Sequence, residues 1–397
     1  MREVVIVGAA RTPTGVIGGT LKDKTPLELG AVVVKELLNR TGIKPDQVEE
    51  VIFGWSRQTT EFANIARNVG LLAGITIDAS GYTIHCQCAA SVKAISCATQ
   101  EIQTGRKDIV IAGGTESLSQ APFYLRKARY GYGAGDGELV DMLTEAGIGG
   151  QPKAMYGVCS MGDTAENVAE QFNITRLEQD EFSMESQRRC WKAISEGRFK
   201  DEIVPVEIKT KKSTFIFDTD EGPKETDMDK LAALPPVFRK GGSVTAGNSC
   251  GRNDCAAAVA LMSADKAKEL GIKPWARVVT DALVGLEPTI MGVGPIKAVE
   301  KALKQANLTL ADIDLIELNE AFASQSVAVI KGLGLDMSKT NVNGGAIALG
   351  HPVGATGARL MTTLVHELRK RKGRYGMVCL CIGGGQGMAM IIEALYD

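Results

Sequence analysis

The sequence predicts an α/β protein made of two similar halves, with a segment of different character inserted in the first half. Three observations support this fold class. Strand-like and helix-like segments alternate along the chain, the pattern of residues 43–53 returns at 308–318, and residues 120–249 differ from their surroundings in being rich in Tyr, Gly and Lys. Alternation of this kind is typical of a mostly parallel sheet with helices on its faces.

The first half opens with a β-branched run that closes on glycine, and amphipathic helices follow at the 3.6-residue period. Its predicted elements are a strand at 4–7, a helix at 27–38, a strand at 48–53, a helix at 89–103 and a strand at 108–112.

The second half repeats this order. Besides the repeat at 308–318, the strand that ends in glycines at 109–114 resembles the segment at 378–384. We interpret the repeat as a duplicated α/β unit, in which equivalent strand ends face one shared site. The alternative is chance similarity between two amphipathic stretches. The predicted domains are an N-terminal half at 1–119 that continues at 250–272, an inserted loop or lid domain at 120–249 with a helix at 164–171, and a C-terminal half at 273–397.

Composition narrows the classes of function. The chain has 397 residues, 44% of them hydrophobic, with 45 Lys+Arg against 47 Asp+Glu. Nucleic acids and anionic membranes usually require a clustered basic surface, and a net charge of −2 gives no indication of one. No apolar run reaches the roughly 20 residues of a membrane helix, so we expect a cytoplasmic protein, or one of an organelle matrix if a leader has been removed. Nine cysteines, an odd number, argue against a disulfide framework and draw attention to single thiols.

Cys88 lies where a predicted strand meets the predicted helix at 89–103. The unpaired amides of a helix N-terminus stabilise a thiolate and lower the pKa of the thiol. We therefore expect Cys88 to be a nucleophile with a lowered pKa, whereas Cys97, inside the helix, is interpreted as a small buried hydrophobe. Cys86 and Cys88 beside His85 could suggest a metal, but no second ligand pair follows at zinc spacing, so no metal is expected.

His351 lies in a glycine-rich turn just before a predicted helix at 355–368. The glycines and the proline around it indicate a backbone bent tightly against a neighbouring group. A histidine fixed in such a turn suits a general base. The alternative is a structural imidazole bonded to the backbone.

Cys379 and Cys381 close a predicted strand that runs into three glycines at 383–385. Strand alternation places both thiols on one face, and only Cys381 lies at the strand end. The amides of consecutive glycines can point at a developing oxyanion. A phosphate-binding loop is the alternative, but residues 388–393 are typical of a strand and no helix follows, so acyl chemistry is favoured.

Taken in order along the chain, these motifs resemble those of the thiolase family, acyl-CoA acyltransferases of the acetyl-CoA acetyltransferase or 3-ketoacyl-CoA thiolase type. The resemblance runs from residue 5 to the C-terminus. It rests on Cys88, Asn-Glu-Ala-Phe-Ala at 319–323, Gly-His-Pro-Val-Gly-Ala-Thr-Gly-Ala-Arg at 350–359 and Cys-Ile-Gly-Gly-Gly-Gln-Gly at 381–387, together with the segments at 5–13, 113–117, 161–169 and 244–248.

The resemblance implies a thiolase-like fold of duplicated α/β halves in stacked layers with an inserted loop domain. It also implies a two-step covalent reaction that forms or cleaves a carbon–carbon bond between acyl-CoA molecules. By similarity, Cys88 takes the acyl group, His351 activates it, and Cys381 moves the proton at the carbon α to the thioester. Asn319 would hold a water that polarises the thioester oxygen with His351, and the amides of Cys88 and Gly383 would form the second oxyanion hole.

Further positions match the pantetheine and acyl channel, with ordinary core packing as the alternative for each: Met161, Met291, Ala321 and Phe322. Three departures from the family pattern concern this region. The flanks of Cys88 are altered, Ser160 stands where acetoacetyl-forming relatives carry His, and Cys250 stands where the family often has Ser. Because these departures put the short-chain substrate in doubt, we expect a longer or branched acyl chain to be accepted.

The resemblance further implies coenzyme A and acyl-CoA as substrates, no permanently bound cofactor, and a homo-oligomer, either dimer or tetramer. A decarboxylating ketosynthase would share the fold but would lack the Cys381 loop. From another class of function, the chain could be a non-catalytic acyl-CoA-binding or assembly paralogue.

Overall fold

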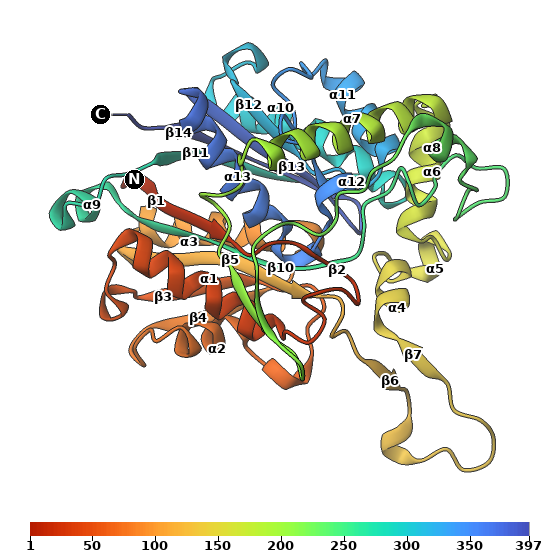
Figure 1. Ribbon diagram of the computed structural model, residues 1–397, viewed down its shortest axis with the longest axis horizontal. Coiled ribbons are helices and arrows are strands. Elements are labelled where there is room, and N and C mark those ends of the chain that lie inside the picture. The colour runs from red at the N-terminus through yellow and green to blue at the C-terminus, as the bar shows by residue number, and fades with distance from the viewer. Residues whose placement is uncertain (397) are drawn as a thin grey trace.

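A large mixed sheet organises the molecule (Figure 1), seen in a computed structural model that describes residues 1–396. From one edge to the other its strands are β12 (Leu315–Leu318), β13 (Tyr375–Ile382), β14 (Gln386–Ala394), β11 (Ala276–Gly285), β1 (Val4–Arg11), β10 (Asn253–Ser263), β5 (Ile109–Ser117), β3 (Glu50–Gly54) and β4 (Ser80–Ile84), with the short β2 (Gly15–Val16) beside β10.

The two halves of this sheet have the same arrangement, which confirms the predicted duplication. In the first half β3 pairs in parallel with β5, β5 pairs antiparallel with β10, and β10 pairs antiparallel with β1. In the second half β12, β13, β14 and β11 repeat these three relations. The halves join through β1 and β11, at the pairs Val5–Arg277 and Ile6–Ala276 only.

The prediction of a mostly parallel sheet is wrong. Among residues 1–396, the strands of this sheet that pair in parallel are β3 with β4 and β5, and β12 with β13, and helices lie between these strands along the chain. Strand β14 follows β13 after a three-residue turn, and so short a connection allows only antiparallel pairing. Strand β10 enters the first half from the inserted segment and fills the position between β1 and β5 in the antiparallel direction.

Two helices lie between the halves of the sheet, α3 (Ala90–Gln103) and α13 (Thr356–Arg371). One hydrophobic cluster combines their side chains with residues of strands from both halves. In the first half α1 (Pro26–Thr41) and α2 (Ile65–Leu72) cover the outer face. In the second half α10 (Gly294–Ala306) and α11 (Ala323–Leu333) do the same, so the layers alternate helix and sheet.

Local sequence explains the ends of these elements. Helix α1, for example, begins after Thr25, whose side chain accepts from the Glu28 amide at 3.2 Å while the Glu28 carboxylate accepts from Thr25. It ends at Gly42, which has the left-handed φ of 71° that glycine tolerates. The predicted helices and strands of both halves are confirmed to within a few residues.

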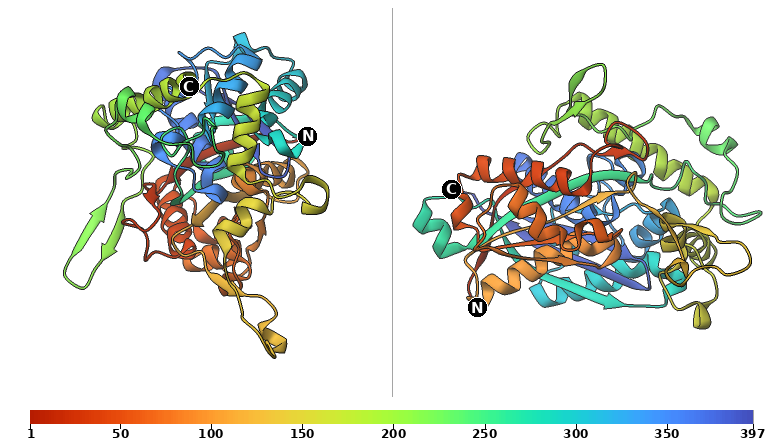
Figure 2. Two further views of the ribbon diagram at one scale, coloured as in Figure 1. Left: turned by 90° about the vertical axis from the view of Figure 1, so that its right-hand side faces the viewer. Right: turned by 90° about the horizontal axis from the view of Figure 1, so that it is seen from below.

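Within residues 120–249, all of which the structure describes, no strand joins the large sheet. The elements of this segment are β6 (Phe123–Leu125), β7 (Leu139–Asp141), α4 (Met142–Ile148), α5 (Lys153–Tyr156), α6 (Met161–Gln171), α7 (Arg176–Ser195), β8 (Val206–Lys209), β9 (Thr214–Phe217) and α8 (Met228–Ala233). The hairpins β6–β7 and β8–β9 project from the body of the molecule (Figure 2). Two short helices complete the described chain, α9 (Ala264–Leu270) and α12 (Ala346–Leu349).

Across residues 1–396, none of the helices combines the length and the apolar character needed to span a bilayer.

Candidate active site

Cys88 lies in the tight turn between β4 and α3. A single turn of 3₁₀ helix, Gln87–Ala89, leads directly into α3. Gln87 has a φ of 45°, and its carbonyl accepts a hydrogen bond from the Ser56 hydroxyl at 2.9 Å. At the end of β3, a Cβ on Gly54 would lie 2.4 Å from the backbone of Ala90, so only glycine lets the start of α3 approach this strand. These contacts fix the thiol at the carboxyl edge of the sheet.

The prediction of a lowered pKa for Cys88 is wrong. Burial raises the pKa of this thiol, and the hydrogen bond from the Gly383 amide, the positive charge of Arg57 and the amide of Cys88 itself only partly oppose burial. The amide and charge effects favour thiolate as expected from the helix start, but removal from water outweighs them. A base is therefore needed to take the thiol proton.

His351 provides a neutral imidazole beside this thiol. Its ring Nδ1 lies 2.7 Å from the hydroxyl of Thr356, the first residue of α13, and its backbone N–H donates to Asn253 Oδ1 at 3.0 Å. Burial, and then the positive charges of Arg359 and Arg57, lower the pKa of His351 to about 3. At neutral pH the ring is uncharged and able to accept a proton.

Asn319 follows β12 and faces the same ring. Its backbone N–H donates to the Cys379 carbonyl at 2.9 Å, which ties it to β13. Its side-chain nitrogen lies 3.5 Å from His351 Nε2, and its Oδ1 is buried without a hydrogen-bond partner among the described residues. A buried amide oxygen without a partner is costly, so this position suits a water or a substrate group that supplies a donor.

Cys381 is the next-to-last residue of β13, and the glycine turn begins two residues later. Gly384 and Gly385 adopt left-handed φ values of 91° and 80°, which this turn requires. Burial and then the nearby Cys88 raise the pKa of Cys381 well above its usual range. The thiol is therefore protonated at rest, and it packs in a cluster with Met291 and Phe322.

The two halves meet closely at this site. Helix α13 crosses α3 where a Cβ on Gly357 would lie 2.6 Å from the Val92 amide. This close approach brings Cys88 from the first half beside His351, Asn319 and Cys381 from the second.

A pocket of about 330 Å³ opens over these groups. Its walls include most of the predicted site residues, namely Cys88, Ser160, Met161, Cys250, Met291, Ala321, Phe322, His351 and Gly383. Asn319 lies behind His351, and Cys381 lies beneath the pocket in the same apolar cluster as Met161. The structure thus gathers all the predicted site residues in one place.

Ser160 has a second task that the sequence pattern did not show. It caps α6: its hydroxyl accepts from the Asp163 amide at 3.1 Å and donates to the Asp163 carboxylate at 2.7 Å. Its small side chain therefore lines the pocket with its hydroxyl turned to the helix.

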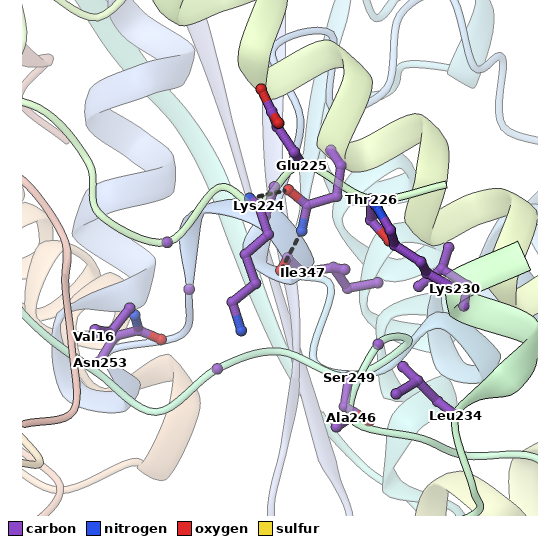
Figure 3. A pocket seen from close by; sticks show the side chains of 17 residues that line it. Val16, Lys224, Glu225, Thr226, Lys230, Leu234, Ala246, Ser249, Asn253 and Ile347 are labelled. Atoms are coloured by element: carbon purple, nitrogen blue, oxygen red, sulfur yellow. Dashed lines mark hydrogen bonds between the residues drawn. The ribbon is translucent and has the colours of Figure 1, made fainter. Parts of the chain in front are cut away.

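A second cavity of about 350 Å³ adjoins the first and shares Ser249 and Gly251 with it. Figure 3 shows the Lys224 side chain extending across this cavity, with Lys230 on α8 near its rim. Gln187 of α7 holds the loop that carries Lys224 in place. Its Oε1 accepts from the Lys224 amide at 2.9 Å, and its Nε2 donates to the Ile347 carbonyl at 3.4 Å.

Sequence reasoning missed several residues of this site. Thr356 lies within the motif at 350–359 and could have been found from its place at the start of the predicted helix at 355–368, five residues after His351. Asn253, which holds the His351 backbone, and the pocket arginines Arg57 and Arg252 carry no local signal.

Comparisons with known proteins agree with this geometry. The sequence matches the family description "Thiolase, N-terminal domain" over residues 4–265 and "Thiolase, C-terminal domain" over residues 272–394. An acetyl-CoA acetyltransferase of Syntrophomonas wolfei is 51% identical, over 99% of this chain and 100% of that protein.

Solved structures are similar over their whole length. An acetyl-CoA acetyltransferase of Bacillus anthracis has a TM-score of 0.97 at 46% identity, covering 100% of this chain and 99% of the other. Human mitochondrial 3-ketoacyl-CoA thiolase in complex with CoA has a TM-score of 0.94 at 42% identity, covering 99% and 98%.

Proposed function

The chain belongs to the thiolase family, and we propose from this premise that Cys88 accepts the acyl group in its reaction. The protein is an acyltransferase of the thiolase class, which cleaves a 3-oxoacyl-CoA with CoA or runs the reverse condensation. One observation carries the assignment of Cys88. The Gly383 N–H, from the other half of the molecule, donates a hydrogen bond to the Cys88 sulfur, which lies beside the neutral ring of His351.

In the cleavage direction, His351 takes the proton from the Cys88 thiol, and the sulfur attacks the 3-oxo carbon of the substrate. The amides of Cys88 and Gly383 stabilise the resulting oxyanion. The bond between C2 and C3 then breaks, and the leaving enolate takes a proton from Cys381. The CoA thiol then gives its proton to Cys381 and attacks the acyl-cysteine. The bond between the acyl carbon and the Cys88 sulfur breaks, which releases a shortened acyl-CoA, and the Cys88 sulfur takes its proton back from His351.

The enolate needs its own stabilisation on the other side of the carbonyl. Asn319, with its unpartnered buried Oδ1, is placed to hold a water there together with His351. A protonated Cys381 suits an acid that must give a proton to carbon and take it back in the condensation direction.

The direct test is CoA-dependent cleavage of a 3-oxoacyl-CoA by the purified protein, measured as the loss of the absorbance of the substrate's enolate. We expect turnover with no added metal or cofactor. A protein that binds acyl-CoA but never cleaves it would instead be a non-catalytic paralogue, which none of the comparisons supports.

Ser160 is expected to widen the acyl specificity. The small side chain leaves room in the pocket where an imidazole would fill it, and each buried methylene is worth about 0.8 kcal/mol, so two carbons shift the preference roughly tenfold. We expect kcat/KM for six- and eight-carbon 3-oxoacyl-CoA to equal or exceed that for acetoacetyl-CoA, and Ser160→His to narrow the preference to the short substrate.

Because Ser160→His also removes the cap of α6, we expect a loss of stability of about 1 kcal/mol. Ser160→Asn is the matched control, since it keeps a capping side chain. A steep fall in rate with chain length in the unaltered enzyme would contradict the prediction.

We further propose that the second cavity receives the nucleotide end of CoA. It adjoins the reaction pocket, and the phosphates of CoA would meet Lys224 and Lys230 there. Because these ammonium groups are exposed, each contact is worth at most about 1 kcal/mol. We expect Lys224→Ala to raise KM for CoA about three- to fivefold and to leave kcat unchanged, with Lys209→Ala on hairpin β8–β9 as the control. An unchanged KM in Lys224→Ala would place the nucleotide elsewhere.

We also propose that the protein forms a homo-oligomer, either a dimer or a tetramer. The projecting hairpin β6–β7 exposes Phe123, Leu125 and Leu139, and clustered exposed apolar side chains are typical of association surfaces. The nine thiols are all unpaired, which supports a reducing compartment such as the cytoplasm.

A further inference from the structure

Arg57 is a charged residue in the wall of the reaction pocket that the mechanism above does not use. It lies three residues beyond the end of β3 and lines the pocket together with Cys88. Its side chain is half-buried. One terminal nitrogen lies 3.4 Å from Gln87 Oε1, a long contact, and its Nε is buried without any hydrogen-bond partner.

No acidic side chain of the described chain, residues 1–396, forms an ion pair with Arg57. The nearest candidate, Glu116, directs its carboxylate to three backbone amides, those of Ser56 at 3.2 Å, Arg57 at 3.1 Å and Gly354 at 2.8 Å. Burial raises the pKa of Glu116 although Arg57 and these amides oppose burial. Glu116 therefore lies close enough for the charge of Arg57 to act on it, but its carboxylate is taken up by backbone amides and makes no hydrogen bond to the guanidinium.

The surroundings of Arg57 make this charge unusual. The pocket wall is otherwise largely apolar, with Leu118, Leu143, Ile148, Phe238 and Val353 among its members. An unpaired charge in such a place is costly unless a bound ligand supplies the counter-charge.

The second arginine of the pocket differs from Arg57. Arg252 is exposed, and after the hydrogen bonds of Thr144 and Leu143 it contributes to the lowered pKa of Asp141. Its charge thus lies in bulk water, whereas Arg57 is half-buried and keeps a buried Nε without a hydrogen-bond partner among the described residues.

We propose that Arg57 binds a carboxylate at the far end of the acyl chain, so that the enzyme acts on ω-carboxy-3-oxoacyl-CoA thioesters. This inference rests on the proposed function and names its substrate class. A guanidinium offers a carboxylate two parallel N–H donors, the geometry that distinguishes this group from a neutral chain end.

The chemistry stays balanced with such a substrate. With 3-oxoadipyl-CoA, the Cys88 sulfur bonds to C3, the C2–C3 bond breaks, and acetyl-CoA leaves after taking one proton. The succinyl group on Cys88 then passes to CoA. The distal carboxylate is unchanged throughout, so its contact with Arg57 is equally present before and during the reaction and should act mainly on KM.

The test compares two substrates with the same number of carbons, 3-oxoadipyl-CoA and 3-oxohexanoyl-CoA. We expect the unaltered enzyme to prefer 3-oxoadipyl-CoA by about tenfold or more in kcat/KM. Arg57→Gln should lower this preference by about 10- to 100-fold, the range for a charge-assisted hydrogen bond. Any effect of the lost charge on the Cys88 thiolate applies to both substrates and cancels in this ratio. Arg57→Lys should keep part of the preference, because it keeps the charge without the paired donors.

Arg106→Gln is the matched control. Arg106 is an exposed arginine just beyond the opposite end of α3, 3.7 Å from Glu101, and its replacement removes the same charge far from the pocket. The preference of the unaltered enzyme is a further readout independent of any variant's folding, and it should weaken as ionic strength rises.

Two results would overturn the inference. One is a preference of the unaltered enzyme for 3-oxohexanoyl-CoA. The other is an unchanged preference in Arg57→Gln, and if both substrates then lost rate equally, Arg57 would act only on the Cys88 thiolate. Cleavage of neither substrate would overturn the proposed function itself.

Discussion

Replacing Cys88 by alanine is expected to abolish turnover, with kcat falling by about 10⁴-fold or more, because burial raises the pKa of the other thiol in the pocket wall, Cys250, to about 12 and keeps it protonated. Cys381 is too deeply buried to replace it, and burial alone raises its pKa above the usual range. Cys88→Ser should also be inactive, since His351 would have to deprotonate a far weaker acid than a thiol.

Peptide mass mapping after incubation with acetyl-CoA checks this expectation. The acetyl group should be found on Cys88 of the unaltered enzyme and nowhere in Cys88→Ala. Cys86→Ala is the control, because Cys86 lies two residues away but packs against the central cluster, and it should keep the adduct and most of the activity. An adduct on Cys86 or Cys381, together with an active Cys88→Ser, would refute the assignment.

Replacing Cys381 by alanine is expected to separate the two steps of the reaction. The variant should still accept an acetyl group on Cys88, because the His351 ring and the Gly383 amide remain in place. It should lose about 10² or more in turnover, as expected on removal of a general acid and base. Exchange of deuterium at the α carbon of acetyl-CoA measures this role directly and should fall in parallel.

Cys379→Ala is the matched control for this variant. Cys379 lies two residues earlier on the same face of β13 but packs in the outer cluster of the second half. Its replacement removes a thiol and some packing without touching the pocket, so α-deuterium exchange should persist. Undiminished exchange in Cys381→Ala would exclude Cys381 as the residue that moves the α proton.

Much of this arrangement could be predicted from the sequence, because the signals were local. The repeat of 43–53 at 308–318 corresponds to β3 and β12, which occupy equivalent places beside β5 and β13. The turn around His351 and the glycines after Cys381 mark backbone conformations that few other residues adopt.

The errors had a common origin in long-range packing. Sheet direction depends on which strands become neighbours, and β10 reaches its place between β1 and β5 only after a long inserted segment. The pKa of Cys88 depends on burial by the second half, which outweighs the local helix start. Arg57 gave no signal because its importance comes from the pocket that distant parts of the chain build around it and from its Nε, which has no hydrogen-bond partner within residues 1–396.

Helix α13, which is buried except for its last three residues, has a consequence for how the chain is made. Every residue from Thr356 to Leu368 is buried, so this part of the helix has no face toward water. It is stable in its position only when both halves of the sheet enclose it. During translation, the apolar inner face of the first half of the sheet, together with that of α3, therefore stays uncovered until nearly the whole chain has left the ribosome. Exposed apolar surface of this kind favours aggregation, so we expect the nascent first half to require a chaperone until α13 emerges.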